Sequence, residues 1–266
     1  MQNKIYDCVT FFNENYIFDL RYNILKDYVD QFIICESRYD HKGSPKPINF
    51  KNTFNSKKIN HIILEQPFSN SATSWENQAT QREFILQNLN EANDDDYIFF
   101  SDPDEIPNPD IYKNFKLNKK YGIFMQKCFN YKFNLFNEHE SPWEGTRVSK
   151  KKNLYSIDFM RQKVKSKNLN YNFLRLDKEK NIQIFNDAGW HFNNILDIKN
   201  ISIKLKTFAH NEFSNEKYSS IKAIEDNIKK KIDLFGRGHN YKKVNIDSTF
   251  PKYLKDNIIK YAKFII

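Results

Sequence analysis

Strand-like and helix-like patterns alternate through the first hundred residues, and this alternation limits the fold more than any other feature. Helical spacing of apolar residues runs from Ile17 to Tyr28, and Ser74–Asn90 has the pattern of a helix with Ser74 as its N-cap. The β-rich runs around these helices are Lys4–Phe12, Gln31–Glu36, Ile59–Leu64 and Tyr97–Ser101. This order predicts an α/β fold with a mostly parallel central sheet, whose ligands bind at the carboxyl ends of the strands.

The chain beyond Asn108 is less regular, and its C-terminal part is mainly helical. Tyr121–Phe136 is aromatic and β-like, and Ile182–Phe185 is a short strand pattern. Helical patterns follow at Glu216–Ile232 and Pro251–Ile266. No internal repeat and no linker-like composition divides the chain, so we expect one continuous domain over residues 1–266.

The segment Pro251–Ile266 has an apolar stripe at helical spacing. Leu254, Ile258, Ala262 and Ile265 recur at spacings of four, four and three, which places them on one helix face. We expect this segment to be an amphipathic helix docked on the domain. The alternative is a basic helix that lies on an anionic membrane surface.

Composition excludes several classes of protein. An aromatic content of 16% argues against disorder, and no run of about 18 apolar residues is present to form a transmembrane helix. The N-terminus has no signal-peptide pattern, and the three cysteines form no spaced pair of a zinc ribbon or a disulfide framework. These features predict a cytoplasmic protein. A net charge of +9 suits a polyanion, whether nucleic acid, an anionic membrane surface or a phosphorylated small substrate.

Three carboxylates stand directly after the strand pattern Tyr97–Ser101. Asp102, Asp104 and Glu105 would repel one another at a strand end unless a cation lies among them. Hard oxygen ligands of this kind suit Mg²⁺ or Mn²⁺, whose open positions then hold phosphate oxygens. The alternative is a solvated turn after a strand.

The residues around this cluster resemble a known family. Ile98–Pro107, with the sequence IFFSDPDEIP, is similar to the Asp-x-Asp-Glu-Ile-Pro signature of the glycosyltransferases of family 17, the family of the enzyme that adds the bisecting N-acetylglucosamine to N-glycans. Further colinear similarities lie at Tyr6–Phe12, Phe18–Arg21, Val29–Ser37, Gly43–Pro47, Gly189–His191 and Pro251–Leu254. The resemblance therefore spans nearly the whole chain.

The resemblance implies a GT-A-like fold and an inverting transfer of a sugar from a nucleotide-sugar donor, with UDP-N-acetylglucosamine as the expected donor. It implies that Asp102 and Asp104 bind Mn²⁺, or Mg²⁺, through the Asp-x-Asp motif. Residues 1–120 would then form the nucleotide-sugar-binding half, and residues 121–266 the acceptor and closing half. A glycan or a lipid-linked saccharide is the expected acceptor, with peripheral membrane contact as a further expectation.

Other residues are assigned to the donor site on weaker grounds. Glu36 and Ser37 end a buried-type strand and can contact the uracil or ribose, or can cap a loop. Lys46 can reach a phosphate from an extended loop. Arg82 suits the diphosphate because its guanidinium binds phosphate oxygens bidentately, and its alternative role is a buried tie to Asp94–Asp96.

The Gly-Trp-His segment offers two more candidates. His191 can serve as a third metal ligand or contact the leaving phosphate, and its alternative role is that of a core histidine. Trp190 suits stacking on a sugar face, or packing in the core.

An inverting reaction needs a carboxylate that accepts the proton of the acceptor hydroxyl. Glu212, Asp187 and Glu144 are the candidates outside the acidic cluster, and Glu212 is preferred because it stands in a polar turn beside His210.

Two other functions stay open at this point. A metal-dependent nucleotidyl- or phosphotransferase would also present carboxylates and a cation to a diphosphate. A basic nucleic-acid-binding module fits the net charge, but Asp94–Asp96 and Asp102–Glu105 would repel a phosphate backbone, so no nucleic-acid partner is expected.

Overall fold

The computed structural model describes residues 3–207 and 215–266, which form an α/β structure around a mixed sheet of eleven strands. Its main path is, in spatial order, β11 (Lys242–Lys243), β7 (Leu135–Phe136), β6 (Tyr121–Asn130), β8 (Trp143–Lys150), β4 (Tyr97–Ser101), β1 (Ile5–Phe11), β2 (Gln31–Ser37) and β3 (Ile59–Leu64). Three strands pair beside this path: β5 (Glu105–Pro107), β9 (Ile182–Phe185) and β10 (Gly189–Asn193).

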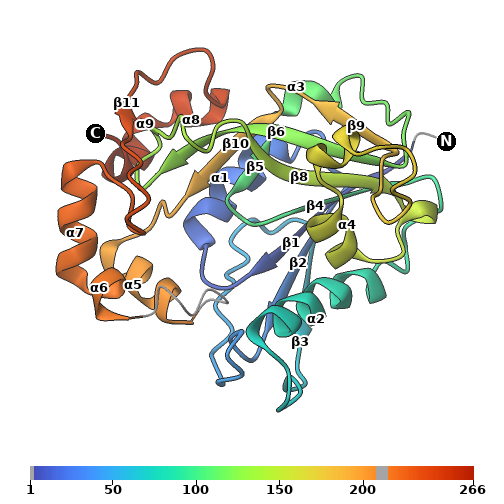
Figure 1. The fold of residues 1–266 in the computed structure, drawn as a ribbon, viewed down its shortest axis with the longest axis horizontal. Coiled ribbons are helices and arrows are strands. Elements are labelled where there is room, and N and C mark those ends of the chain that lie inside the picture. The colour runs from blue at the N-terminus through green and yellow to red at the C-terminus, as the bar shows by residue number, and fades with distance from the viewer. Residues whose placement is uncertain (1–2, 208–214) are drawn as a thin grey trace.

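The helices cover both faces and one end of this sheet (Figure 1). They are α1 (Asn15–Leu25), α2 (Ser74–Gln87), α3 (Pro109–Tyr112), α4 (Ile157–Lys163), α5 (Ile198–Thr207), α6 (Glu216–Ser219), α7 (Ile221–Lys230), α8 (Lys252–Asp256) and α9 (Ile258–Tyr261). Short 3₁₀ turns lie at Lys151–Asn153, Ser166–Asn170 and Ala262–Phe264. None of the helices within the described ranges is long and apolar enough to cross a membrane.

The parallel half of the sheet confirms the predicted α/β fold. Strands β4, β1, β2 and β3 are all parallel, and Cys8 of β1 lies between Phe100 of β4 and Ile33 of β2. Their carboxyl ends therefore meet at one edge, and β4 ends immediately before Asp102. The second half of the chain adds β8, which runs antiparallel to both β4 and β6, and so makes the sheet mixed.

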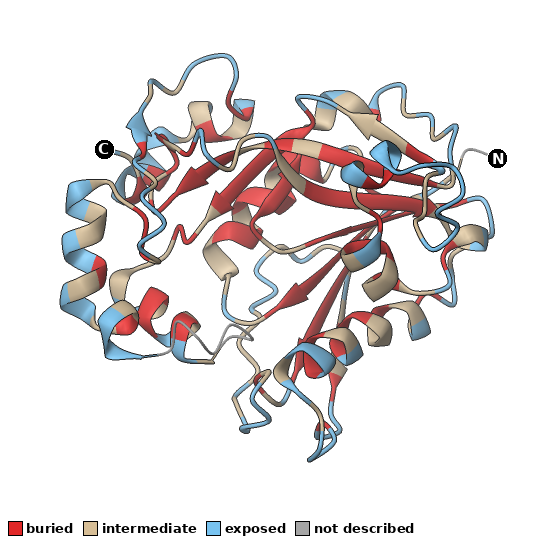
Figure 2. Ribbon diagram, viewed as in Figure 1, coloured by how far each residue is buried: buried red, intermediate tan, exposed pale blue. Residues whose placement is uncertain are grey.

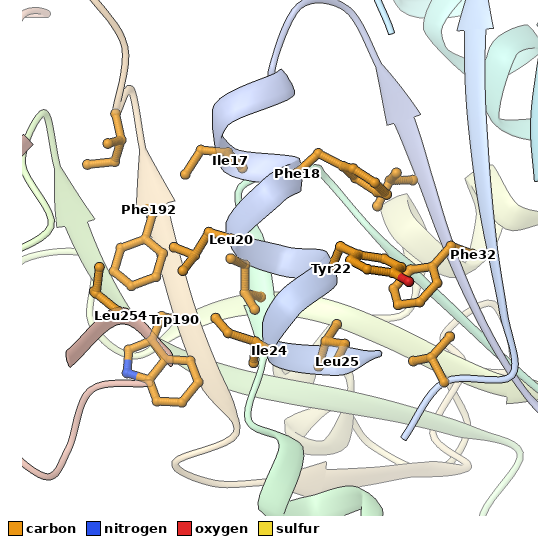
Figure 3. Close-up of a cluster of buried hydrophobic side chains, with 14 of the residues drawn as sticks. Ile17, Phe18, Leu20, Tyr22, Ile24, Leu25, Phe32, Trp190, Phe192 and Leu254 are labelled. Atoms are coloured by element: carbon orange, nitrogen blue, oxygen red, sulfur yellow. The ribbon is translucent and has the colours of Figure 1, made fainter. Parts of the chain in front are cut away.

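Helix α1 packs between the two halves of the structure, and the central strands are buried along their length (Figure 2). One side of α1 faces Trp190, Phe192 and Leu254, and its other side faces Phe32 (Figure 3). Each large apolar side chain buried in this way contributes about 1.5–3 kcal/mol. The continuous core around α1 therefore joins segments from both ends of the chain.

Two helix boundaries differ from the predicted ones. Helix α2 begins at Ser74, but its N-cap is Thr73, which forms a capping box with Glu76. The helical pattern at Glu216–Ile232 is interrupted at Ser220, whose backbone is extended (φ −68°, ψ 144°) and whose side chain caps α7. A single serine with good capping chemistry thus divides the predicted helix into α6 and α7.

The C-terminal segment is docked, but the prediction of its apolar face was wrong. Asn257 (φ −124°, ψ 31°) breaks the helix between α8 and α9, which changes the spacing of the residues after it. Leu254, Tyr261 and Phe264 are buried, whereas Ile258 and Ala262 are exposed.

Candidate active site

A cavity of about 820 Å³ opens at the carboxyl edge of the parallel strands. Figure 1 shows α2 and α4 on one side of these strand ends and α5 on the other. The cavity is lined by residues that follow β1, β2 and β4, as the rule for parallel sheets predicts. Its charged lining residues are Glu14, Asp40, Lys46, Arg82, Asp102, Asp104, Glu140, Glu144, Arg161, Lys165, Lys167, Lys204 and Arg237.

Asp102 lies beside two arginines that also line this cavity. Arg161 of α4 donates to Asp102 Oδ2 at 2.6 Å, and a guanidinium nitrogen of Arg82 on α2 lies 3.8 Å from Oδ1. Burial disfavours the charged carboxylate, but the two arginines outweigh this effect and lower the pKa of Asp102. The first carboxylate of the motif is therefore ionised and held from the α2 and α4 side.

Asp104 is held from the opposite side of the cavity. His191 Nε2 lies 3.5 Å from Oδ1, and Lys204 Nζ of α5 lies 3.6 Å from Oδ2. Burial opposes ionisation here too, but Lys204 and His191 outweigh it and keep the pKa of Asp104 below its usual range. The Asp-x-Asp motif thus connects the two walls of the cavity.

Glu105 does not line the cavity, and its side chain fixes the acidic turn. Its side chain is fully buried, and it accepts hydrogen bonds from Trp143 Nε1 (2.7 Å) and from Arg161 (2.6 Å) at Oε1, and from the backbone N–H of Asp102 (3.1 Å) at Oε2. Beneath the turn, Arg21 of α1 donates to the carbonyl of Glu105 and forms a buried ion pair with Asp7 of β1. The third acidic residue of the cluster is therefore structural.

Gly189 allows β10 to bring His191 against this turn. The φ of Gly189 is +143°, and a Cβ there would lie 2.2 Å from the carbonyl oxygen of Ile106. The close pairing of β10 with β5 places His191 opposite Glu105. Burial disfavours the charged imidazole, but Cys128 and Asp104 outweigh this and raise the pKa of His191. Trp143 packs against its ring at a centroid distance of 4.7 Å, with the two ring planes tilted by 31°.

The chemistry of the acidic turn fits a divalent cation in one respect. Asp102 and Asp104 are two ionised carboxylates that line the cavity, and hard cations are commonly held by one or two carboxylates together with substrate phosphates and water. Within residues 3–207 and 215–266, however, no group of three or more His, Cys, Asp or Glu side chains is placed to hold a metal ion. The side chains therefore offer two carboxylates, and His191 is placed as an ion-pair partner of Asp104.

Two of the four other predicted donor residues line the cavity. Lys46 lines it while paired to Glu36 at 2.8 Å. Arg82 lines it while bonded to Asp158 at 2.8 Å, and its described ion pairs do not include the alternative tie to Asp94–Asp96. Glu36 is fully buried and accepts the backbone N–H of Asn49. The cavity wall does not include Glu36, nor Ser37, which holds the turn after β2.

The remaining predictions have mixed outcomes. Trp190 lies outside the cavity lining, because alternate residues of β10 face opposite sides and His191 takes the cavity side. Its ring packs in the core and its Nε1 donates to the carbonyl of Thr249. Asp187 is exposed in the turn before β10 and does not line the cavity. Glu212 and His210 lie outside the described residues.

Several lining residues were missed by sequence reasoning. Arg161, Lys165 and Lys204 stand on or after helices far along the chain, and nothing in their local sequence separates them from the other scattered cations. Glu14 stands three residues beyond β1, so the strand-end rule applied to β1 would have found it. Burial raises the pKa of Glu14 above its ordinary value.

Comparison with known proteins decides the family. The sequence model of glycosyltransferase family 17 matches residues 1–244. The chain belongs to glycosyltransferase family 17. This confirms the resemblance drawn from the motifs, and the Asp-x-Asp turn and the Gly-Trp-His segment both lie within the matched range.

Characterised relatives match a smaller part of this family 17 chain. It is 30% identical to the human β-1,4-mannosyl-glycoprotein 4-β-N-acetylglucosaminyltransferase over 110 residues, which cover 36% of this chain and 21% of that protein. It is 26% identical to the rat protein of the same name over 116 residues, which cover 39% and 22%. The alignments thus span about a fifth of the length of these relatives.

Solved structures overlap the chain only loosely. A glycosyltransferase involved in the glycosylation of the major capsid of PBCV-1 covers 69% of this chain, with 82% of that chain aligned, at 11% identity and a TM-score of 0.35. Glucosyl-3-phosphoglycerate synthase from Mycobacterium tuberculosis, in complex with Mn²⁺, UDP and phosphoglyceric acid, covers 95% of this chain, with 91% of that chain aligned, at 10% identity and a TM-score of 0.36. Overlaps at this level carry no argument about function.

Proposed function

We propose that this member of family 17 transfers a sugar, N-acetylglucosamine from a UDP donor, to a hydroxyl of a glycan or a lipid-linked saccharide, with inversion at the anomeric carbon. One observation carries the proposal. The ionised Asp102 and Asp104 open onto a cavity whose two walls are rich in cations. A diphosphate leaving group needs both features, because carboxylates alone would repel it.

The cations fall into two groups with different positions. Arg82, Arg161 and Lys165 lie on the α2 and α4 side, and Lys204 lies on α5. Burial, together with the nearby arginines, lowers the pKa of Lys165 to about 8, so it is still largely protonated at neutral pH. We assign the first group to the donor diphosphate, since guanidinium groups bind phosphate oxygens bidentately.

A divalent cation, Mn²⁺ or Mg²⁺, would be held by Asp102 and Asp104 and would stabilise negative charge on the departing diphosphate. The protein's own residues prepare this site. Glu105 holds Arg161, and Arg161 in turn orients Asp102. Lys204 and His191 orient Asp104. The carboxylates are thereby ionised and positioned before the donor arrives.

The proton of the acceptor hydroxyl needs a base in the cavity, and we assign that role to Glu14. It lines the cavity, and its Oε2 accepts the backbone N–H groups of Phe12 and Asn13 at 2.9 Å, which fixes its orientation. Its raised pKa makes it a stronger base than an ordinary carboxylate. The acceptor oxygen bonds to the anomeric carbon, the bond from that carbon to the diphosphate oxygen breaks, and the proton passes to Glu14.

Both halves of the chain contribute to this site. The proposed donor half, residues 1–120, supplies Asp102, Asp104 and Arg82, whereas residues 121–266 supply Arg161, Lys165 and Lys204. Trp143 also lines the cavity from the second half and offers an aromatic face that suits a sugar ring. We therefore propose that the two halves act as one glycosyltransferase domain.

The test is a thermal-shift screen of nucleotide sugars with and without Mn²⁺, followed by analysis of the released nucleotide. We expect UDP-N-acetylglucosamine and Mn²⁺ to stabilise the protein together more than the sum of their separate effects. Release of UDP supports glycosyl transfer. Release of UMP would instead establish a nucleotidyl- or phosphotransferase reaction.

The variant that tests the metal site is Asp104→Asn, which keeps the size of the side chain and one acceptor oxygen but removes the charge that pairs with Lys204 and His191. We expect this variant to lose the metal-dependent stabilisation and at least about 100-fold in rate. Wild-type activity in this variant, or unchanged wild-type activity in EDTA, contradicts the proposal.

A further inference from the structure

Exposed apolar side chains are concentrated in the segment that connects α4 to β9. Leu176 is 92% exposed, Phe173 78% and Leu174 70%, with Leu169 and Tyr171 also exposed nearby. Most exposed apolar residues of a protein occur singly. Five within eight positions of one connection are a patch, which we name the 169–176 loop.

The hydrogen bonds that close the 169–176 loop do not involve the side chains of Phe173, Leu174 and Leu176. Its backbone is closed by hydrogen bonds from the N–H of Arg175 to the carbonyl of Asn172 and from Lys180 Nζ to the carbonyls of Asn172 and Arg175. Polar groups therefore hold the turn, while the apolar side chains of Phe173, Leu174 and Leu176 project outward. Folding alone gives no reason for apolar residues at these positions.

The segment that contains the loop is rich in cations. Residues 163–180 contain six lysines and arginines against Asp177 and Glu179. Asp177 pairs with Arg175 and Lys178, and Glu179 pairs with Lys120, and the six cations against two carboxylates leave the segment with a net charge of +4. The loop therefore presents apolar side chains within a positively charged rim, which complements a surface that is anionic outside and apolar beneath.

We propose that the 169–176 loop inserts into the interfacial region of an anionic lipid bilayer and holds the enzyme at a membrane surface. Apolar side chains enter the acyl boundary while lysines of this segment other than Lys165 pair with anionic headgroups. The C-terminal segment, the other membrane candidate, is docked through Leu254, Tyr261 and Phe264.

The segment that carries the loop begins at the cavity and then leaves it. Lys165 and Lys167 line the cavity, but none of residues 169–176 does. Ile182, at the start of β9, pairs with Tyr121 at the end of the sheet where β4 begins, opposite the carboxyl edge. Membrane binding by the loop therefore does not depend on the proposed function.

The first test is co-sedimentation with vesicles of phosphatidylcholine and of phosphatidylcholine with about 30% phosphatidylglycerol, whose surface carries a negative potential. We expect binding only to the anionic vesicles, weakened by added salt. The triple variant Phe173→Ser, Leu174→Ser, Leu176→Ser should lose about 10-fold or more in partitioning, with an unchanged melting temperature. The matched control is Ile259→Ser, because Ile259 is also 92% exposed but stands on α9. It should bind like the wild type.

A second measurement reports insertion directly. Cys8, Cys35 and Cys128 are all buried, so a polarity-sensitive fluorophore can be attached selectively to Leu174→Cys. We expect a blue shift of its emission with anionic vesicles and no shift when the same fluorophore is on Ile259→Cys.

Three results would overturn the proposal. The first is a wild-type protein that does not bind anionic vesicles. The second is a triple variant that binds as well as the wild type. The third is a wild-type dimer in lipid-free solution that the triple variant converts to a monomer, because the loop would then be a protein interface. Each result leaves the release of UDP or UMP untouched, so failure here is distinguishable from failure of the proposed glycosyl transfer.

Discussion

Arg21 lies beneath the acidic turn and donates a hydrogen bond of 2.6 Å to the backbone carbonyl of Glu105. The same guanidinium is paired to Asp7 and bonded to the hydroxyl of Ser101. A fully buried cation thus joins α1, β1 and the end of β4 at the point where the Asp-x-Asp motif begins. The position of the motif depends on a group that never reaches the cavity.

Asp7→Asn should therefore destabilise the protein strongly. The substitution leaves Arg21 buried without its counter-ion, which costs about 3–5 kcal/mol in the free energy of unfolding. Urea unfolding measures this change. The control is Glu65→Gln, which breaks an exposed pair with Arg38 and should leave the midpoint essentially unchanged. An unaltered midpoint for Asp7→Asn would show that the buried pair does not support the turn.

Glu14→Gln should reduce kcat by about 100-fold or more while leaving the KM for the donor similar, because the base acts on the acceptor proton. The base works only when deprotonated, so wild-type kcat should fall as the pH drops through the raised pKa of Glu14, at a higher pH than the ordinary 4.5 of a glutamate. This fall of kcat at low pH should be absent from the Glu14→Gln variant. Glu140→Gln and Glu144→Gln are the comparisons, and a larger loss in either would move the role of base to that residue.

Lys165 should make donor binding sensitive to alkaline pH. Its pKa of about 8 means that its ammonium loses its proton as the pH rises through that value. The KM for UDP-N-acetylglucosamine should then increase between about pH 7 and 9, since one charge facing the diphosphate disappears. Lys165→Arg should remove this increase, because a guanidinium stays protonated throughout. The same rise of KM in both proteins would exclude Lys165 as its source.

Phe264→Ala should cost about 3–5 kcal/mol of unfolding free energy, because its ring is buried against Tyr16 and Phe133 in the main core. Ile259→Ala, at an exposed position of α9, should be close to neutral. Thermal and urea unfolding of both variants measure the difference. Equal effects would mean that the last turn of the chain is not docked as described.

Much of the parallel half of the fold was predictable from the sequence, since its strands are short apolar runs bounded by turn residues. The predicted ranges Ile59–Leu64, Tyr97–Ser101 and Ile182–Phe185 match the observed strands. The position of Asp102 at a strand end followed directly from Tyr97–Ser101. Asn257 and Ser220 interrupted predicted helices because their local backbone and capping chemistry overrode the apolar spacing.

The cationic side of the site was not predictable in the same way. Arg161 meets Asp102 across 59 residues of sequence, and only tertiary structure brings them together. Trp190 illustrates a different limit. The motif Gly-Trp-His draws attention to both large residues, but alternation along a strand allows only one of them to face the cavity. In the structure, His191 lines the cavity and Trp190 does not.

The order in which the chain is synthesised gives this arrangement a consequence. Asp102 and Asp104 leave the ribosome well before Arg161 and Lys204, so the acidic turn is made before most of its counter-charges. Arg82, at 3.8 Å from Asp102, is the early partner among the described contacts of that carboxylate. A nascent chain that ends near residue 120 therefore carries the two carboxylates without Arg161, His191 and Lys204. The full set of counter-charges around the turn is present only after α4 and α5 have been translated.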